Sequence, residues 1–93
     1  MIRELIKLKN FCCLVFSSAQ QALAAEHIVD TRALPALIIP TPRIITASCG
    51  LSLKCRLEDE ATVTAVLRAE GIEPEACYIC TEGQLPVLKW KGT

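Results

Sequence analysis

The chain has 93 residues, of which 52% are hydrophobic, and its ten basic residues balance its ten acidic ones. This length fits one small domain, and the apolar content supports a folded core rather than disorder. The neutral charge argues against nucleic acid or an acidic membrane as a partner. No apolar run approaches the roughly 20 residues of a membrane span.

Six cysteines in so short a chain fit either a secreted disulfide scaffold or a reduced protein of the cytoplasm. The first 25 residues resemble a signal peptide, with basic residues followed by an apolar run at 11–16. That run is short, however, and cleavage would remove a strand and part of a helix. We therefore expect a cytoplasmic protein that keeps its N-terminus and its reduced thiols.

Four strands and two helices are expected in chain order. The first strand, residues 11–16, is apolar on both faces. Ser18 then begins a helix, because Ser18 and Gln21 have the spacing of a capping box. Leu34-Pro35 ends that helix, since proline disfavours helical geometry in the residue before it. The other strands are expected at residues 36–39, 51–57 and 76–81.

The second helix follows the third strand. It begins with the acidic run Glu58-Asp59-Glu60, which suits the positive end of a helix dipole, and Gly71 ends it. The resulting order predicts an α+β fold of the ferredoxin-like βαββαβ type, with two helices on one face of a four-stranded antiparallel sheet.

The expected fold divides the chain into three parts. Residues 11–81 form the ferredoxin-like domain, residues 1–10 an N-terminal extension, and residues 82–93 a C-terminal tail. The sheet face opposite the helices is expected to be partly apolar, because the first strand has no polar side. Exposed apolar surface of this kind often marks self-association, so a homodimer is one possible assembly.

The connection between the second and third strands is the most informative segment. Residues 40–50 exceed the about 2–5 residues of an ordinary hairpin loop, and long ordered loops often carry function. Cys49 lies there beside Ser48 and Gly50. Gly50 permits a turn whose backbone N–H groups point at an anionic sulfur, and Arg43 adds positive charge. Cys49 is therefore a candidate for an accessible thiolate, although free cysteines are also often buried as small hydrophobes.

The sequence around this cysteine resembles the signature of a small bacterial family of selenium/sulfur carrier-like proteins. The resemblance rests on Leu37–Arg43 and on Ala47–Leu53, and it extends from about Phe11 to Cys80. The matching motif positions of this chain are Arg43, Ser48, Cys49 and Gly50.

The resemblance implies a function in which a cysteine holds sulfur or selenium as a persulfide or its selenium analogue. Cys49 would be the covalent attachment point, and Arg43, Ser48 and Gly50 would bind the cargo. Such a protein is a carrier rather than an enzyme, and no cofactor is expected. Its partners would be a sulfur or selenium donor enzyme, such as a cysteine desulfurase, and an acceptor protein that the sequence does not identify.

Two other functions remain open. One is a non-catalytic interaction or regulatory module that dimerises through the open sheet face, with Cys49 in a structural role. The other is a metal-binding module, because Cys77 and Cys80 have the spacing of a redox or zinc motif. Residues three apart on a strand point to opposite faces, however, so these two sulfurs could not share a metal.

We therefore expect the purified protein to contain no stoichiometric zinc. Elemental analysis after purification without chelators measures this directly. One zinc ion per chain that is lost in Cys77→Ser or Cys80→Ser would contradict the expectation and the strand assignment behind it.

Overall fold

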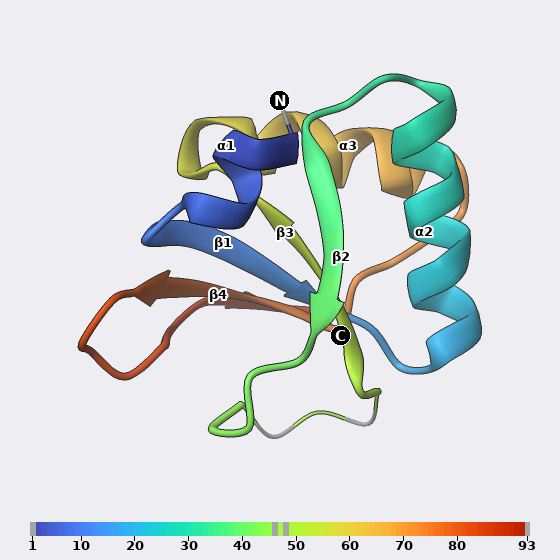
Figure 1. The fold of residues 1–93 in the computed structure, drawn as a ribbon. Helices are drawn as coiled ribbons and strands as arrows, with labels where there is room; N and C mark the ends of the chain where they lie inside the picture. Colours follow the sequence, from blue (N-terminus) through green and yellow to red (C-terminus); the bar gives the residue numbers. More distant parts are fainter. Residues whose placement is uncertain (1, 46, 48, 93) are drawn as a thin grey trace.

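The computed structural model describes residues 2–45, 47 and 49–92. Its strands form one antiparallel sheet in the order β2-β3-β1-β4-β5 (Figure 1). The strands are β1 (Asn10–Val15), β2 (Ala36–Pro40), β3 (Leu51–Cys55), β4 (Ala76–Thr81) and β5 (Val87–Lys91). The helices are α1 (Ile2–Lys7), α2 (Ala19–Thr31) and α3 (Glu60–Ala69), with a 3₁₀ turn, η1 (Leu57–Asp59), before α3.

The expected four-stranded ferredoxin-like sheet with two helices is wrong, although the α+β class is confirmed. The additional strand is β5, which lies in the expected C-terminal tail and pairs with β4. The additional helix is α1, which lies in the expected N-terminal extension and buries Leu5. Both elements are short, and segments of this length depend on packing against the rest of the molecule rather than on their own propensity.

Helices α2 and α3 enclose the main core against one face of the sheet. The Ser18 hydroxyl caps α2 by accepting a hydrogen bond from the backbone N–H of Gln21 at 3.2 Å, as expected. Gly71 follows α3 with a φ of +85°, a conformation that glycine adopts without strain. The core between these helices and the sheet includes Leu14, Phe16, Ala22, Ala25, Val29, Leu53, Val63 and Leu67, all fully buried.

The opposite face of the sheet is covered in part by α1 and by the loop that follows β2. Lys54 of β3 reaches the end of α1, where its Nζ donates to the carbonyl oxygens of Ile6 at 3.2 Å and Leu8 at 3.3 Å. The loop contributes the buried side chain of Ile45. This second, smaller core comprises Cys13, Val15, Ile45, Ala76 and Cys80.

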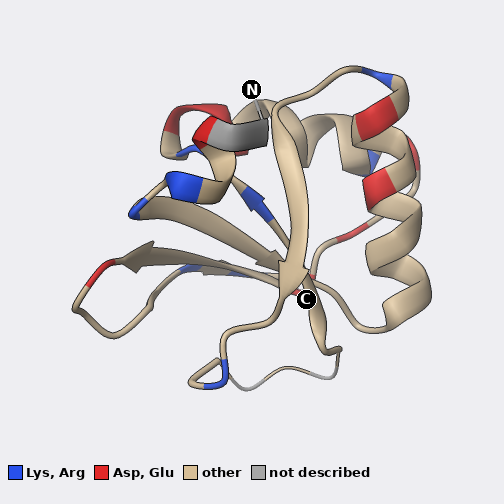
Figure 2. Ribbon diagram, in the orientation of Figure 1, with Lys and Arg blue, Asp and Glu red and all other residues tan. Residues whose placement is uncertain are grey.

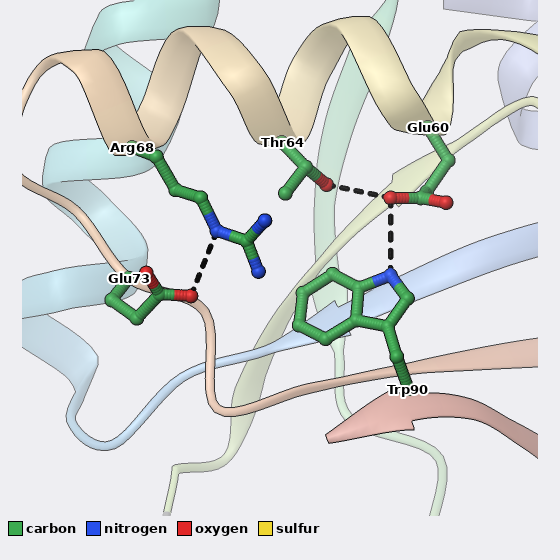
Figure 3. A network of polar contacts seen from close by, with 5 residues as sticks. All are labelled: Glu60, Thr64, Arg68, Glu73 and Trp90. Atoms are coloured by element: carbon green, nitrogen blue, oxygen red, sulfur yellow. Dashed lines mark hydrogen bonds and ion pairs between the residues drawn. The ribbon is translucent and has the colours of Figure 1, made fainter. Parts of the chain in front are cut away.

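A buried carboxylate connects β5 to α3. Glu60 is 4% exposed, and its Oε2 accepts hydrogen bonds from Thr64 Oγ1 at 2.8 Å and Trp90 Nε1 at 3.2 Å (Figure 3). Its Oε1 accepts a hydrogen bond from Lys89 Nζ at 2.6 Å. The guanidinium of Arg68 lies over the Trp90 ring, 4.9 Å from its centroid. These contacts hold the last strand against the helix layer.

Charged residues of both signs are interspersed over the helices and hairpins of the molecule (Figure 2). This pattern agrees with the balanced composition and differs from the single-sign surface typical of nucleic-acid-binding proteins. Within the described part of the chain, no helix has the length and apolar content needed to cross a membrane.

The buried carboxylate of Glu60 gives a prediction about stability. Substitution Glu60→Gln should lower the free energy of unfolding by about 2 kcal/mol, because it removes the charge that strengthens three hydrogen bonds. The matched control is Glu58→Gln in η1, whose side chain is 70% exposed and lies 3.8 Å from Arg56. That variant should change stability by less than about 0.5 kcal/mol. Equal urea denaturation curves for the two variants would contradict the role given to Glu60.

The free energy of unfolding should also depend on pH through the carboxylate of Glu60. Burial alone raises the pKa of Glu60, but hydrogen bonds from Lys89, Thr64 and Trp90 lower that pKa on balance below its ordinary value of 4.5. A carboxyl group with a depressed folded pKa stabilises the fold above its unfolded pKa and loses this contribution as pH falls through the folded pKa. The free energy of unfolding should therefore fall between about pH 5 and pH 3, and less steeply in Glu60→Gln. If the wild-type protein and Glu60→Gln lose the same free energy of unfolding over this pH range, the assignment to Glu60 is contradicted.

Candidate functional site

The loop between β2 and β3 is fastened at its base by Thr41. The Thr41 backbone N–H donates to the carbonyl oxygen of Gly50 at 2.8 Å, and its hydroxyl donates to the carbonyl oxygen of Cys49 at 3.0 Å. The Ser52 hydroxyl lies 2.6 Å from the Thr41 hydroxyl, and it is the donor of that pair because the Thr41 proton is already engaged. The two ends of the loop are therefore held together beyond the β2–β3 ladder.

Cys49 lies in the main core rather than in the accessible position that the sequence suggested. Its side chain is 4% exposed and belongs to the cluster of buried residues between the helices and the sheet. Its Sγ accepts a hydrogen bond from the backbone N–H of Leu51 at 3.2 Å. Cys49 thus has one polar contact within mostly apolar surroundings.

The other expected cargo-binding residues have different environments. Arg43 is exposed at the tip of the loop, and no ion pair between described residues involves it. Gly50 is also exposed, but it lacks a positive φ, and a Cβ placed there would meet no atom within 4 Å. Ser48 and the neighbouring Thr46 lie outside the described residues.

The loop passes from one face of the sheet to the other. Ile45 packs in the smaller core beside α1, whereas Cys49, four residues later, packs in the main core beneath the helices. Two buried side chains therefore anchor the loop, while Arg43, Ile44 and Gly50 remain at the surface. Arg43 is the only charged residue of the loop.

Cys77 and Cys80 occupy opposite faces of the sheet, as expected from their spacing on a strand. Cys77 belongs to the main core and Cys80 to the smaller core. Strand pairing gives each a neighbour on β1, because the register places Phe11 opposite Cys80 and Cys13 opposite Tyr78. Cys80 therefore lies diagonally across from Cys13, and Cys77 lies diagonally across from Cys12 by the same register. The spacing within each strand could not reveal these partnerships.

Cys12 and Cys77 also lie close to Glu60. One sulfur from each cysteine and one oxygen of Glu60 are all within 4.8 Å of one another, the single such group of potential metal ligands among the described residues. Both oxygens of Glu60 already accept hydrogen bonds. A hydrogen bond to Cys77 lowers the pKa of Cys12, and the same contact raises that of Cys77. Each of the three groups thus already has a partner within the protein, and the cluster is explained as core structure.

The remaining candidates are less distinctive. Cys55 lies opposite Cys12 in the β1–β3 register, and burial raises the pKa of its thiol to about 12, as expected for a core cysteine. His27 is exposed on α2, in agreement with its expected place at the surface.

Comparison with known proteins identifies the family of the chain. No curated protein and no solved structure matches the sequence. The family described as "Putative Se/S carrier protein-like" matches residues 11–79. This range begins in β1 and ends in β4, so it contains the loop with Cys49 and excludes α1 and β5. The chain therefore belongs to the Putative Se/S carrier protein-like family.

Proposed function

We propose that this protein carries sulfur or selenium on Cys49, as a persulfide or its selenium analogue. The proposal rests on membership of the family and on the hydrogen bond that Leu51 donates to the Cys49 sulfur at 3.2 Å. A persulfide is formed by a thiolate, and the fraction of thiolate together with access determines how fast it forms. The Leu51 N–H supports the anionic form in this proposal.

Access would come from movement of the loop. Cys49 is 4% exposed, so a donor enzyme reaches its sulfur only when the segment around it opens. Arg43, Ile44 and Gly50 are exposed, so opening of this segment requires release of the Ile45 and Cys49 side chains from the core. Exposed Arg43 would then approach the donor's cargo, and Gly50 and Ser48 would supply backbone and hydroxyl donors.

The partners in this proposal are a donor enzyme of the cysteine desulfurase type and an acceptor protein whose identity is open. The protein itself would transfer the atom without turnover of a substrate. We place it in the cytoplasm, because its six cysteines are all unpaired and buried and a reducing compartment keeps them in this state.

The competing function is an interaction or regulatory module that forms a homodimer through the sheet face opposite α2 and α3. Part of that face is already occupied by α1 and Ile45, which reduces the apolar surface left for a partner. Exposed Ile44, Leu85 and Val87 remain as candidate contacts. A stable dimer whose Cys49 does not accept sulfur would favour this function over the carrier.

The carrier proposal predicts that Cys49 accepts sulfur. Incubation with a cysteine desulfurase and cysteine should add one sulfur atom to Cys49, as measured by peptide mass spectrometry. Limiting iodoacetamide should modify Cys49 before the fully buried residues Cys12, Cys13, Cys55 and Cys77. Arg43→Ala should slow both reactions by about threefold, since it removes the only charge of the loop, whereas Arg32→Ala at the end of α2 should not.

Two further variants separate the carrier from the structural role. Gly50→Ala should retain the stability of the wild-type protein, because the added Cβ meets no atom within 4 Å. Cys49→Ser should abolish transfer and, because the site is buried, cost about 1–2 kcal/mol of stability. If Cys49 reacts as slowly as the fully buried cysteines and accepts no sulfur, its role is structural and the proposal fails.

A further inference from the structure

A second thiol lies at a groove on the face of the sheet that α1 partly covers. The groove has a volume of about 470 Å³ and is lined mainly by apolar side chains. It runs between the start of β1, the loop after β2 and the turn between β4 and β5, and its lining includes Leu8, Phe11, Pro42, Ile44, Cys80 and Pro86. This volume is in the range of pockets that bind small molecules.

Cys80 is the most accessible of the six cysteines. Its side chain is 8% exposed, against 4% for Cys49 and 0% for the four others. A hydrogen bond from the Cys13 thiol lowers the pKa of Cys80, burial opposes this, and the charge of Lys54 lowers it further. The same hydrogen bond raises the pKa of Cys13. Cys13 is fully buried, so Cys80 is the sulfur of this pair that a molecule in the groove can reach.

Lys54 places a buried positive charge on the same face of the sheet, opposite Cys13 in the β1–β3 register. Its side chain is 6% exposed, and its Nζ lies 4.3 Å from the centroid of the Phe11 ring, which also lines the groove. Its hydrogen bonds go to the neutral carbonyl groups of Ile6 and Leu8. Among the described residues no carboxylate forms an ion pair with it.

A buried ammonium whose partners are all neutral is costly, because carbonyl groups and an aromatic ring replace only part of its hydration. Burial lowers the pKa of Lys54, and the neighbouring Cys80 acts in the opposite direction. A thiolate or persulfide on Cys80 is the anion that would balance this charge. The other charged groups at the groove, Lys9 and Glu82, are exposed and pair with each other at 3.5 Å.

We propose that Cys80 is a second attachment site for sulfur or selenium, with Lys54 as the cation that balances its anionic form. This inference rests on the proposed carrier function but concerns a residue outside the matched range 11–79. The groove would receive the apolar body of a persulfide donor, and Cys13 would hold the Cys80 sulfur in place by its hydrogen bond.

The transfer step is a displacement at sulfur. The Cys80 thiolate attacks the terminal sulfur of the donor persulfide, so a new S–S bond forms while the S–S bond of the donor breaks. The donor leaves as a thiolate. The proton of the transferred sulfur stays on that sulfur or is lost to water. No oxidant is required, because the transferred sulfur keeps its oxidation state.

The test uses the full chain and limiting inorganic tetrasulfide, followed by alkylation and peptide mass spectrometry. One added sulfur atom is expected on Cys80 and none on Cys77, a residue of the same strand that is fully buried. Lys54→Met should slow the reaction of Cys80 with iodoacetamide at pH 7 about tenfold, and Lys54→Arg about twofold or less. Lys9→Met is the matched control, since this groove lysine is 75% exposed, and it should leave the rate unchanged.

The outcomes separate the two sites. Sulfur on both cysteines, or on Cys80 alone, supports the inference, and the second result also overturns the proposal for Cys49. Sulfur on Cys49 alone overturns the inference and leaves the carrier function standing, whereas sulfur on neither overturns both. If Lys54→Met does not fold, the wild-type alkylation rate is measured against pH. A midpoint for Cys80 at or above the ordinary thiol value of 9.0 overturns the role of Lys54.

Discussion

The rest of the structure depends on the burial of β1 from both sides. Residues Cys12, Cys13, Leu14 and Val15 are at most 1% exposed, so the chain must supply cover for two faces of a small sheet. Helices α2 and α3 cover one face, while α1 and the loop with Ile45 cover part of the other. A strand buried on both faces has no polar side, and the apolar run at residues 11–16 reflects this requirement.

The central position of β1 also determines the arrangement of the thiols. Its adjacent cysteines point to opposite faces, and each meets a cysteine of β4 on its own face. Cys12 and Cys77, beneath the helices, are buried beside Glu60, whereas Cys80 of the other pair lines a groove that reaches the surface. Two pairs of the same composition therefore have different access, and access is one of the two factors that control thiol reactivity.

The two buried charges, Glu60 and Lys54, differ in the partners that surround them. Glu60 is compensated by Lys89, Thr64 and Trp90, so it stabilises the contact between β5 and α3. Lys54 has carbonyl groups and an aromatic ring as neighbours, and the proposed thiolate of Cys80 would supply its anion. A buried charge that is paired with an opposite charge contributes to the fold, whereas one with only neutral partners indicates where an anion is favourable.

Local patterns in the sequence determined much of the fold between residues 11 and 81. The cap at Ser18, the end of α3 at Gly71 and the opposite orientations of Cys77 and Cys80 all follow from interactions within a few residues. The motif around Cys49 was also sufficient to indicate the family, whose match covers residues 11–79.

Only the tertiary structure decided the position of Cys49, the pairing of cysteines between β1 and β4, and the places of α1 and β5. The polar neighbours of Cys49 suggested an exposed thiol, but the loop crosses the sheet edge and packs this side chain in the main core. Strand register brings together residues more than 60 positions apart, such as Cys13 and Cys80, and no local periodicity encodes such a contact. Short elements like α1 and β5 form because the sheet and α3 offer them a surface to pack against, which is a property of the assembled fold.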